Sequence, residues 1–585
     1  MSIIKKTVAL WREYGFKTTV SLVGNKIKSN RFIQKQKARK IIVNSLKSKK
    51  NEKLNQELTM SILVPVFNTD ADMLKCVIES VINQTYENVE MCIYDSSDDK
   101  HTGVGKICME YAGKDDRVKY KKGPNKGISE NTNECARMAA GDYFGLLDHD
   151  DILHPKAVCK VMDAVLEHGA DFIYTDEVTF SGKITNIIST NFKPDYSPYL
   201  LRSNNYICHF TAFSRVLFEN SGGFNSEYDG SQDHDLFLRL TDSAKCVYHI
   251  PEILYFWRVH AGSVSDDILA KEYAIKAGIG AVQSFLDKKG INAHAASSEI
   301  YPTVYRIKYE PDITGKVSII VLNHEHIQDL QRCVESLMKT TYDNYEILIV
   351  ENNSRSDELS EYYKLLSMNE RIRIITYNRP FNFSEFNNIA VKQAAGEYIL
   401  FLNNDTEVIN PEWLTEMMMY ATQKDVGAVG ARLFYPDGRL QHCYIVTGVG
   451  EDRVAVHAGL GLAGHDYGYL DRIGMVQDVN AVTGACLLMK KSIFEEVDGF
   501  DEKLAVAYND VDLCLKIRKK GYRIIYTPYA TLTHFESASR GNDLNKKNRE
   551  RLTKEAEYIK NKWGNGLKDP YYNPNFSQDR IYILK

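Results

Sequence analysis

The stretch AAGDYFGLLDHDD at residues 139–151 returns as AAGEYILFLNNDT at residues 394–406, offset by 255 positions. Each version runs from a small-residue turn through an apolar, strand-like run to a group of polar residues. Three further landmarks recur in the same order, namely SILVPVFN (61–68) with SIIVLNHE (318–325), GGF (222–224) with DGF (498–500), and QDHDLFLRL (232–240) with NDVDLCLKI (509–517). A period this long exceeds that of a solenoid repeat, so the sequence predicts two whole duplicated domains.

Each copy begins with the pattern of a strand–helix–strand unit. Copy one has an apolar run typical of a buried parallel strand at 61–67, helical periodicity at 71–83 and a second strand, ending in an acid, at 89–95. Copy two repeats this with a strand at 317–322, a helix at 328–339 and a strand at 346–350. Ligands bind at the carboxyl ends of such strands, and neither first strand is followed by a glycine-rich phosphate loop. We therefore predict an α/β fold that holds a nucleotide by other means.

The composition is that of a folded chain. Its 585 residues leave room for two α/β domains with extensions, and 44% hydrophobic and 26% charged residues exclude a disordered, collagenous or disulfide-scaffold protein. The eleven cysteines are scattered without a CxxC pair, which favours a reducing compartment. No apolar stretch approaches the roughly 18 residues that a membrane span needs. We expect a soluble, cytoplasmic protein.

The net charge is distributed unevenly. Residues 1–50 hold fourteen Lys or Arg against the single acid Glu13, a net +13, which leaves −17 for the rest of a chain whose formal total is −4. Trp11, Phe16 and aliphatic residues are interspersed at loosely helical intervals. This pattern suits peripheral contact with an anionic membrane, whereas the alternative is a solvated helical arm packed on the body. Nucleic-acid binding ranks last, because nothing downstream resembles a base-reading module.

Acidic residues follow the apolar run of each quoted stretch. Asp148, Asp150 and Asp151 come directly after residues 142–147 and would project at the carboxyl end of a strand. Carboxylate oxygens are the ligands that Mg²⁺ or Mn²⁺ prefers, so a metal site is predicted, although a single acid there could simply cap a helix. In copy two Asn403 replaces Asp148, and only Asp405 is charged.

Twelve short motifs occur in order, six in each copy. Those of copy one are PVFN (65–68), YDSSDD (94–99), NKGISENTN (125–133), LLDHDD (146–151), SQDHDLFLRL (231–240) and WRVHAGS (257–263). Those of copy two are VENNS (350–354), FNFSEFNN (381–388), FLNNDT (401–406), AVTGAC (481–486), YNDVDLCLKIR (508–518) and HFESASR (534–540). In these motifs both copies resemble family-2 glycosyltransferases of the GT-A fold. Residues 59–540 resemble the tandem two-domain members found in bacterial surface-polysaccharide clusters.

The resemblance implies a role for residues in each motif. Asp95 falls where the family binds the pyrimidine base of the donor, and its counterpart in copy two is expected to be Asn352, with Glu351 beside it. Four more donor-binding positions are Pro65, Asp98, Asn133 and Asn388. The expected metal ligands are Asp148, Asp150, His260, Asp405 and His534.

Asp233 and Asp510 match the general base of the family. The first acid of the usual Glu-Asp pair is missing, because Gln232 and Asn509 precede these aspartates. Without the resemblance, either aspartate could be a simple partner of a helix N-terminus, and His260 a loop histidine. His442, His457 and His465 with Cys443 fit no structural zinc spacing.

These roles agree with the chemistry of glycosyl transfer. A divalent metal offsets the charge that develops on a departing diphosphate, and a carboxylate can take the proton of an acceptor hydroxyl. One metal and one base, with no second carboxylate evident as a nucleophile, predict direct displacement with inversion. The resemblance further implies a dTDP-rhamnose or UDP-hexose donor, and a lipid-linked cell-wall, capsule or O-antigen polysaccharide as the product at the inner face of the membrane.

The expected organisation is a basic arm at 1–58, a first transferase domain at 59–300 and a second at 301–585. One alternative stays open, in which one copy is a degenerate module that only binds glycan.

Overall fold

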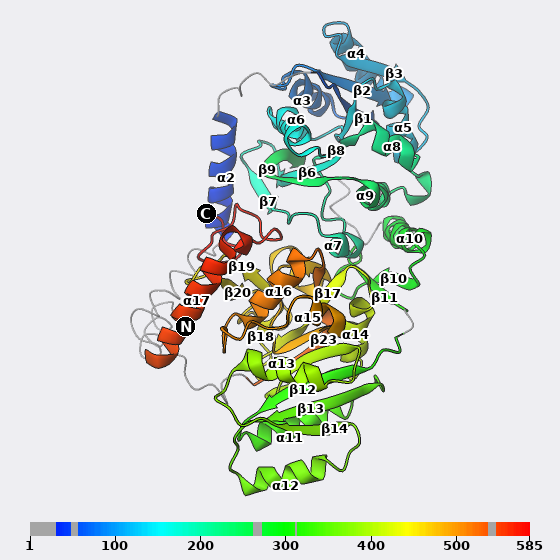
Figure 1. Cartoon of the computed structure of the whole chain (residues 1–585). Helices are drawn as coiled ribbons and strands as arrows, with labels where there is room; N and C mark the ends of the chain where they lie inside the picture. The colour runs from blue at the N-terminus through cyan, green and yellow to red at the C-terminus, as the bar shows by residue number, and fades with distance from the viewer. Residues whose placement is uncertain (1–30, 48–56, 261–271, 311–312, 536–545) are drawn as a thin grey trace, which may run out of the picture.

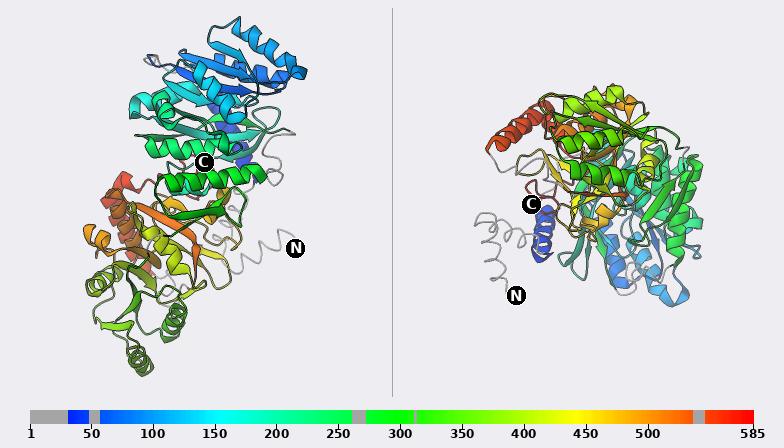
Figure 2. Two further views of the ribbon diagram at one scale, coloured as in Figure 1. Left: turned by 90° about the vertical axis from the view of Figure 1, so that its right-hand side faces the viewer. Right: turned by 90° about the horizontal axis from the view of Figure 1, so that it is seen from below.

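Two mixed β-sheets with packed helices form the body of the protein (Figure 1). The computed structural model describes residues 31–47, 57–260, 272–310, 313–535 and 546–585. The first sheet and its helices, coloured blue to green, occupy one end of an elongated molecule, and the second sheet occupies the other end, as two further views also show (Figure 2).

The first sheet has the strand order β3-β2-β1-β4-β8-β6-β9-β5, and β7 pairs with β6 beside it. β1 runs parallel to β2 and β4, whereas β8 is antiparallel to both β4 and β6. The strands are β1 (Met60–Val66), β2 (Val89–Asp95), β3 (Val118–Lys122), β4 (Tyr143–Leu146), β5 (Ile152–Leu153), β6 (Phe172–Phe180), β7 (Ile187–Asn191), β8 (Thr211–Ser214) and β9 (Val247–Arg258).

The second sheet repeats this order as β14-β13-β12-β15-β22-β17-β23-β16, with the same parallel and antiparallel pairs. Its strands are β12 (Val317–Asn323), β13 (Tyr345–Glu351), β14 (Ile372–Thr376), β15 (Tyr398–Asn403), β16 (Thr406–Val408), β17 (Val426–Phe434), β22 (Cys486–Lys490) and β23 (Arg523–His534). β18 (Leu440–His442) and β21 (Gln477–Val479) are short additions to this sheet, whereas β19 (Ile445–Thr447) and β20 (Ala455–His457) form a separate two-stranded sheet. The predicted fold class, two tandem α/β domains of the GT-A type, is confirmed.

The helices expected at residues 71–83 and 328–339 are present, with ends that differ by at most two residues. Copy one contains α3 (Ala71–Ile82), α4 (Thr102–Ala112), α5 (Ile128–Met138), α6 (Ala157–His168), α7 (Pro198–Ser203), α8 (Arg215–Ser221), α9 (Gln232–Ser243) and α10 (Glu272–Lys288). Copy two contains α11 (Ile327–Leu337), α12 (Asp357–Leu366), α13 (Phe383–Gln393), α14 (Trp413–Ala421), α15 (Lys491–Glu496), α16 (Asn509–Lys519) and α17 (Lys546–Trp563). Strands β1 and β2 are buried along their whole length, which explains their apolar sequences.

The small-residue turn before β4 is held by a buried network. Ser61 Oγ donates to Glu90 Oε1 over 2.6 Å, and the backbone N–H of Gly141 donates to Ser61 Oγ over 2.9 Å. A Cβ at position 141 would lie 2.5 Å from Ser61 Oγ and 2.8 Å from the carbonyl oxygen of Thr59, so the turn requires glycine. The same contacts recur in copy two among Ser318, Glu346 and Gly396. The repeated AAG therefore encodes the approach of this turn to the first strand.

A hairpin connects the two sheets. β10 (Ala293–Ser297) and β11 (Tyr305–Tyr309) pair in antiparallel register. The domain boundary expected at residue 300 falls inside this hairpin and would separate its two strands. We therefore propose that the second domain begins after β11, near β12.

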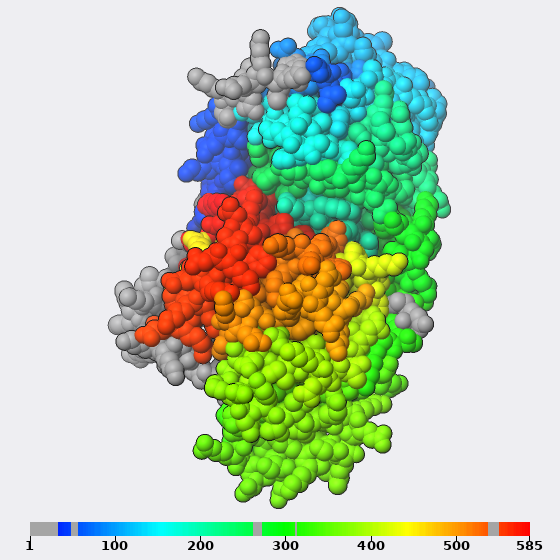
Figure 3. Space-filling view, in the orientation of Figure 1, coloured from blue at the N-terminus to red at the C-terminus, as the bar shows by residue number. Residues whose placement is uncertain are grey.

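The basic N-terminal region is helical over α2 (Arg31–Lys47), while residues 1–30 lie outside the described ranges. α2 packs beside β7 and the C-terminal segment, which is the contact of blue and red surfaces in Figure 3. Ala38 and Ile42 are completely buried, and Lys37 Nζ donates to the carbonyl oxygen of Leu584 over 2.6 Å. Within the described ranges, no helix has the length and apolar character to cross a bilayer.

Candidate active sites

Each sheet gathers its candidate residues at one edge. The parallel strands β1, β2 and β4 end side by side, and the motifs PVFN, YDSSDD and LLDHDD continue from their carboxyl ends. In copy two β12, β13 and β15 do the same. The topology therefore places both candidate sites where open α/β sheets bind ligands.

Asp95 closes the carboxyl end of β2 and is completely buried. Its Oδ1 accepts a hydrogen bond from the N–H of Ser97 over 2.9 Å, and its Oδ2 accepts one from the hydroxyl of Tyr120 over 3.1 Å. Lys122 Nζ lies 3.2 Å from the same Oδ2. Burial, and then the negative charge of Asp95, raise the pKa of Tyr120, so this hydroxyl stays a donor.

Glu351, and not Asn352, is the structural counterpart of Asp95. The strand register pairs Val66 with Asp95 in copy one and Asn323 with Glu351 in copy two. Glu351 repeats the contacts of Asp95, since Oε1 accepts the N–H of Ser354 over 2.6 Å and Oε2 accepts the hydroxyl of Tyr363. The pairing expected from sequence is therefore wrong by one residue, and in a strand a slip of one residue turns a side chain to the other face.

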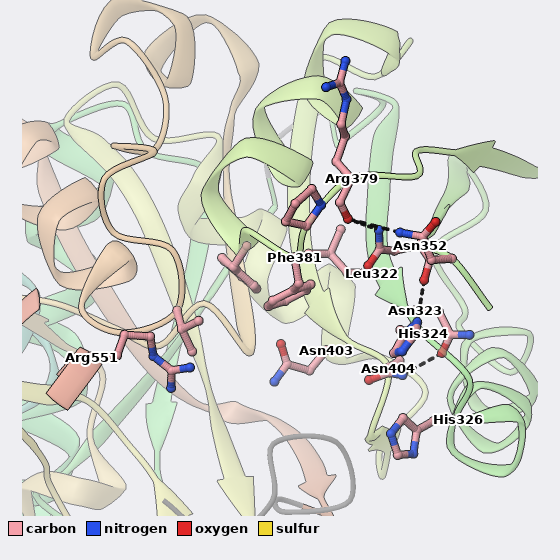
Figure 4. A pocket seen from close by; sticks show the side chains of 14 residues that line it. Leu322, Asn323, His324, His326, Asn352, Arg379, Phe381, Asn403, Asn404 and Arg551 are labelled. Atoms are coloured by element: carbon pink, nitrogen blue, oxygen red, sulfur yellow. Dashed lines mark hydrogen bonds between the residues drawn. The ribbon is translucent and has the colours of Figure 1, made fainter. Parts of the chain in front are cut away.

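Asn352 instead faces a cavity of about 480 Å³ in copy two (Figure 4). Its Nδ2 donates to the carbonyl oxygens of Tyr377 over 3.0 Å and Arg379 over 2.8 Å. Other residues that line this cavity are Asn323, His324, His326, Phe381, Asn403, Asn404 and Arg551. A polar rim around an aromatic side chain suits a nucleotide base with its sugar.

The remaining predicted donor-binding residues have clear positions. Pro65 lies buried in β1 opposite Tyr94. Asp98 is exposed, and it accepts hydrogen bonds from Asn68 Nδ2 over 3.0 Å and from the N–H of Lys100 over 3.0 Å. A hydrogen bond from His101 lowers the pKa of Asp98.

Asn133 and Asn388 position the GGF and DGF turns. The amide of Asn133 pairs with both backbone groups of Phe224, with distances of 3.0 Å to the carbonyl oxygen and 3.0 Å to the N–H. Asn388 pairs in the same way with Phe500, over 3.0 and 2.9 Å. These contacts give both asparagines a structural role, and their donor-binding role stays a prediction.

Asp150 and His260 come together in copy one, with 2.8 Å between Asp150 Oδ2 and His260 Nε2. Asp148 lies close by and half exposed, with its Oδ2 3.6 Å from His209 Nε2. Asp151 faces inward, where its carboxylate accepts the hydroxyl of Tyr255 and the N–H of Arg258, each over 2.6 Å. Burial, and then the charges of Asp148 and Asp150, raise the pKa of Asp151 well above its usual value.

The donor set of copy one fits a hard divalent cation. Two carboxylates that concentrate negative charge, with an imidazole beside them, can hold Mg²⁺ or Mn²⁺ when phosphate and water complete the coordination. In the described part of the chain, no three acidic, His or Cys side chains converge into a complete metal site.

Copy two brings together the equivalent residues with one carboxylate fewer. Asp405 Oδ1 lies 3.1 Å from His534 Nε2, and Asn403 Nδ2 lies 3.2 Å from the same nitrogen. His534 is the last residue of β23, whereas His260 follows the end of β9, so the two histidines reach matching acids from different backbone positions. A cavity of about 190 Å³ adjoins Asn403, His534 and Asp510.

The two candidate bases occupy the first turn of a helix. Asp233 is the second residue of α9, and no group in the described ranges donates a hydrogen bond to its carboxylate. Burial raises the pKa of Asp233 to about 6, while His209 lowers it and Asp148 raises it. Asp510 is the second residue of α16, and its Oδ2 accepts the N–H of Gly484 over 2.9 Å.

Comparison with known proteins identifies one matching region in each of the two copies. A family model described as Glycosyl transferase family 2 matches residues 61–221 and 318–497. The chain belongs to glycosyl transferase family 2.

Two relatives match this glycosyltransferase over most of its length. "Uncharacterized protein y4gI" of Sinorhizobium fredii is 39% identical over 89% of the chain and 58% of the relative. "O-antigen biosynthesis protein RfbC" of Myxococcus xanthus is 33% identical over 90% of the chain and 41% of the relative. The chain thus spans roughly half the length of these relatives. The solved mannosyltransferase PcManGT of Pyrobaculum calidifontis aligns with a TM-score of 0.32 and 16% identity over 43% of this chain and 66% of its own.

One residue of the glycosyltransferase site escaped the sequence motifs. His209 precedes β8 and stacks on Tyr255 with 4.7 Å between ring centres. Its Nε2 lies 3.6 Å from Asp148 Oδ2, and its positive charge lowers the pKa of Asp233. Strand register gives Ala485 as its counterpart in copy two. The sequence offered one indication of His209. It lies just before β8, at the position where copy two has the motif AVTGAC before β22.

His442 and His457 form a pair in copy two, with 3.1 Å between their Nδ1 atoms. His442 Nε2 accepts the N–H of Thr483 over 3.3 Å, and burial lowers the pKa of His442 well below its usual value. His457 lines the smaller cavity, and His442 lies beside it.

Proposed function

We propose that this glycosyltransferase moves sugars from nucleotide-sugar donors to a growing cell-surface polysaccharide, with one active site in each copy. The observation that carries the proposal is a repeated triad at each sheet edge, in which an acid meets a histidine near an aspartate at a helix N-terminus. The members are Asp150, His260 and Asp233 in copy one, and Asp405, His534 and Asp510 in copy two. The name of the relative RfbC supports a polysaccharide product.

The chemistry follows from the residues of copy one. Asp148, Asp150 and His260 would hold Mg²⁺ or Mn²⁺, which supplies positive charge to a departing diphosphate. Asp233 accepts the proton of the acceptor hydroxyl as that oxygen attacks the anomeric carbon. Within the described ranges no protein group donates a hydrogen bond to its carboxylate, which leaves both oxygens open to the acceptor hydroxyl. A single displacement without a covalent sugar intermediate inverts the anomeric centre.

The finer specificity is also proposed. We assign dTDP-rhamnose or a UDP-hexose as donor and a lipid-linked saccharide as acceptor, at the inner face of the cell membrane. The basic residues 1–50 would attract the anionic surface there. A glycan-binding role for copy two is the second candidate, because Asn403 removes one acid from its site.

The test is transfer by the purified chain from a panel of nucleotide-sugars to a lipid-linked or short synthetic acceptor, with and without EDTA. We expect one donor to be consumed, and we expect Asp150→Ala to lower copy-one transfer about a hundredfold or more, because the diphosphate loses its metal. Asp72→Ala, an exposed acid on α3, is the control and leaves transfer unchanged. No transfer from any donor would overturn the proposal, and full activity in EDTA would overturn its metal.

A further inference from the structure

Arg551 of α17 lines the larger cavity of copy two. Figure 4 shows it entering from the side opposite Asn352 and His326. Phe383, Asn403 and Val506 line both this cavity and the smaller one that holds Asp510 and His534. The two cavities therefore adjoin, and Arg551 lines the larger of them.

The guanidinium has no protein partner in the described ranges. Neither a hydrogen bond nor an ion pair joins it to any described residue, and its Nε is shielded from water without an acceptor. A shielded donor without an acceptor is unfavourable unless a ligand supplies one. The planar fork of arginine matches the oxygens of a phosphate, which it binds through two parallel hydrogen bonds.

The helix that carries Arg551 is fixed against the loop before the base. The carboxylate of Glu555 accepts the N–H groups of Ala505 over 3.1 Å and Ala507 over 2.9 Å. Trp563 Nε1 donates to Asp512 Oδ1 over 2.8 Å at the end of the same helix. Residues four apart share a helix face, so Glu555 holds the face of α17 that presents Arg551.

Copy one has no such cation on the matching helix. The corresponding helix in sequence order is α10. If the two helices are aligned on His260 and His534, Ala277 corresponds to Arg551. If they are aligned on Asp233 and Asp510, Ala274 corresponds to it. Copy one has Asp148 where copy two has Asn403. Compared with copy one, copy two therefore lacks one carboxylate of the proposed metal site and has an arginine side chain in addition.

We infer that Arg551 binds the diphosphate of the nucleotide-sugar in copy two, where it supplies positive charge that copy one obtains from a metal. The inference rests on the proposed function and names one further residue for it. Copy two then binds a nucleoside diphosphate without a divalent cation, whereas copy one requires one.

The test measures binding of UDP, dTDP and GDP, and of the matching nucleosides, by calorimetry in EDTA. All proteins are the full chain carrying Asp148→Ala and Asp150→Ala, which disable the diphosphate site of copy one. Arg551→Ala should weaken binding of the diphosphate roughly ten- to a hundredfold and leave nucleoside binding unchanged, because a charge-assisted hydrogen bond is lost. Arg551→Lys should retain part of the affinity, and Arg549→Ala, exposed on the same helix, should match the parent.

A reverse substitution adds a second readout. Asn403→Asp restores the acid of copy one, and Mn²⁺ should then strengthen diphosphate binding in copy two several-fold more than in the parent. Unchanged diphosphate affinity in Arg551→Ala overturns the inference while leaving the transferase intact. A parent protein that binds none of the three diphosphates, with or without Mn²⁺, overturns the proposed function of copy two instead.

Discussion

At the scale of single residues, the environment of Asp233 decides its protonation. Burial removes water from the carboxylate and raises its pKa to about 6, while the imidazole of His209 lowers the pKa and the charge of Asp148 raises it. The carboxylate must be ionised to accept a proton, and a raised pKa makes it a stronger base than an exposed aspartate. Asp233 is therefore suited to general-base catalysis near neutral pH.

The pH dependence of copy one follows from this pKa. We expect kcat/KM to fall about tenfold per pH unit below about pH 6, because the protonated carboxyl cannot take the acceptor proton. His209→Gln should move this acid limb to higher pH, since it removes the neighbour that lowers the pKa. The measurement is a pH–rate profile with Asp510→Asn present to silence copy two. An acid limb near pH 4, the value for an exposed aspartate, would contradict the assignment.

At the scale of elements, α2 is both a basic segment and a structural one. Its Ala38 and Ile42 are buried against the body, and Gln34 accepts the N–H of Leu584 over 2.9 Å. Arg39 and Lys40 are exposed on the same helix. The two interpretations of the basic region, membrane contact and a packed arm, are thus compatible over residues 31–47, because they use different faces.

Truncation should separate these two roles. Removing residues 1–30 deletes six Lys or Arg and one acid, and we expect it to weaken binding to anionic vesicles while transfer to a soluble acceptor survives. Removing residues 1–50 should in addition lower the thermal midpoint, because α2 leaves its buried contacts. Vesicle co-sedimentation at low and high salt provides the measurement, since salt screens exposed charges beyond about 10 Å at 0.1 M. Equal sedimentation of the shortened and complete chains would assign the region a structural role alone.

At the scale of the whole molecule, buried polar contacts join the two copies. Ser197 Oγ donates to Asp478 Oδ2 over 2.6 Å, and Asn573 Nδ2 from the C-terminal segment donates to Asp176 Oδ2 over 2.8 Å. Asp176 also meets His249, with 3.0 Å between its Oδ1 and the Nε2 of that histidine. The sites nevertheless sit on separate sheets, so each can act on its own substrates.

We expect the two copies to catalyse separate transfers. Their walls differ, since His209 of copy one corresponds to Ala485, and residues 192–210 share little sequence with residues 465–486. Asp233→Asn should lower one transfer by about 10²–10⁴-fold and Asp510→Asn the other, each leaving a glycan stopped at a different step. Mass and linkage analysis of the product of each variant is the measurement. A wild-type product made at the wild-type rate by Asp510→Asn would leave copy two as a glycan-binding module.

The amino-acid sequence by itself determined the duplication, the α/β fold and most of the residues that the structure gathers at each candidate site. Apolar runs, helical periodicity and the acids that follow them are local patterns, and local burial dictates them within a few residues. Gly141 and Gly396 are an example. In each copy this turn lies so close to the first strand that a Cβ would clash, so glycine is required at both positions.

Only the tertiary structure decided which side chains meet. Glu351 takes the place of Asp95 because strand register fixes the pairing, and VENNS offers two neighbouring polar residues that the sequence alone cannot rank. His209 reaches Asp148 across 61 positions, and Arg551 reaches the cavity of Asn403 across 148. Such contacts depend on the order of strands in the sheet and on helices packed from distant parts of the chain, which local periodicity does not encode.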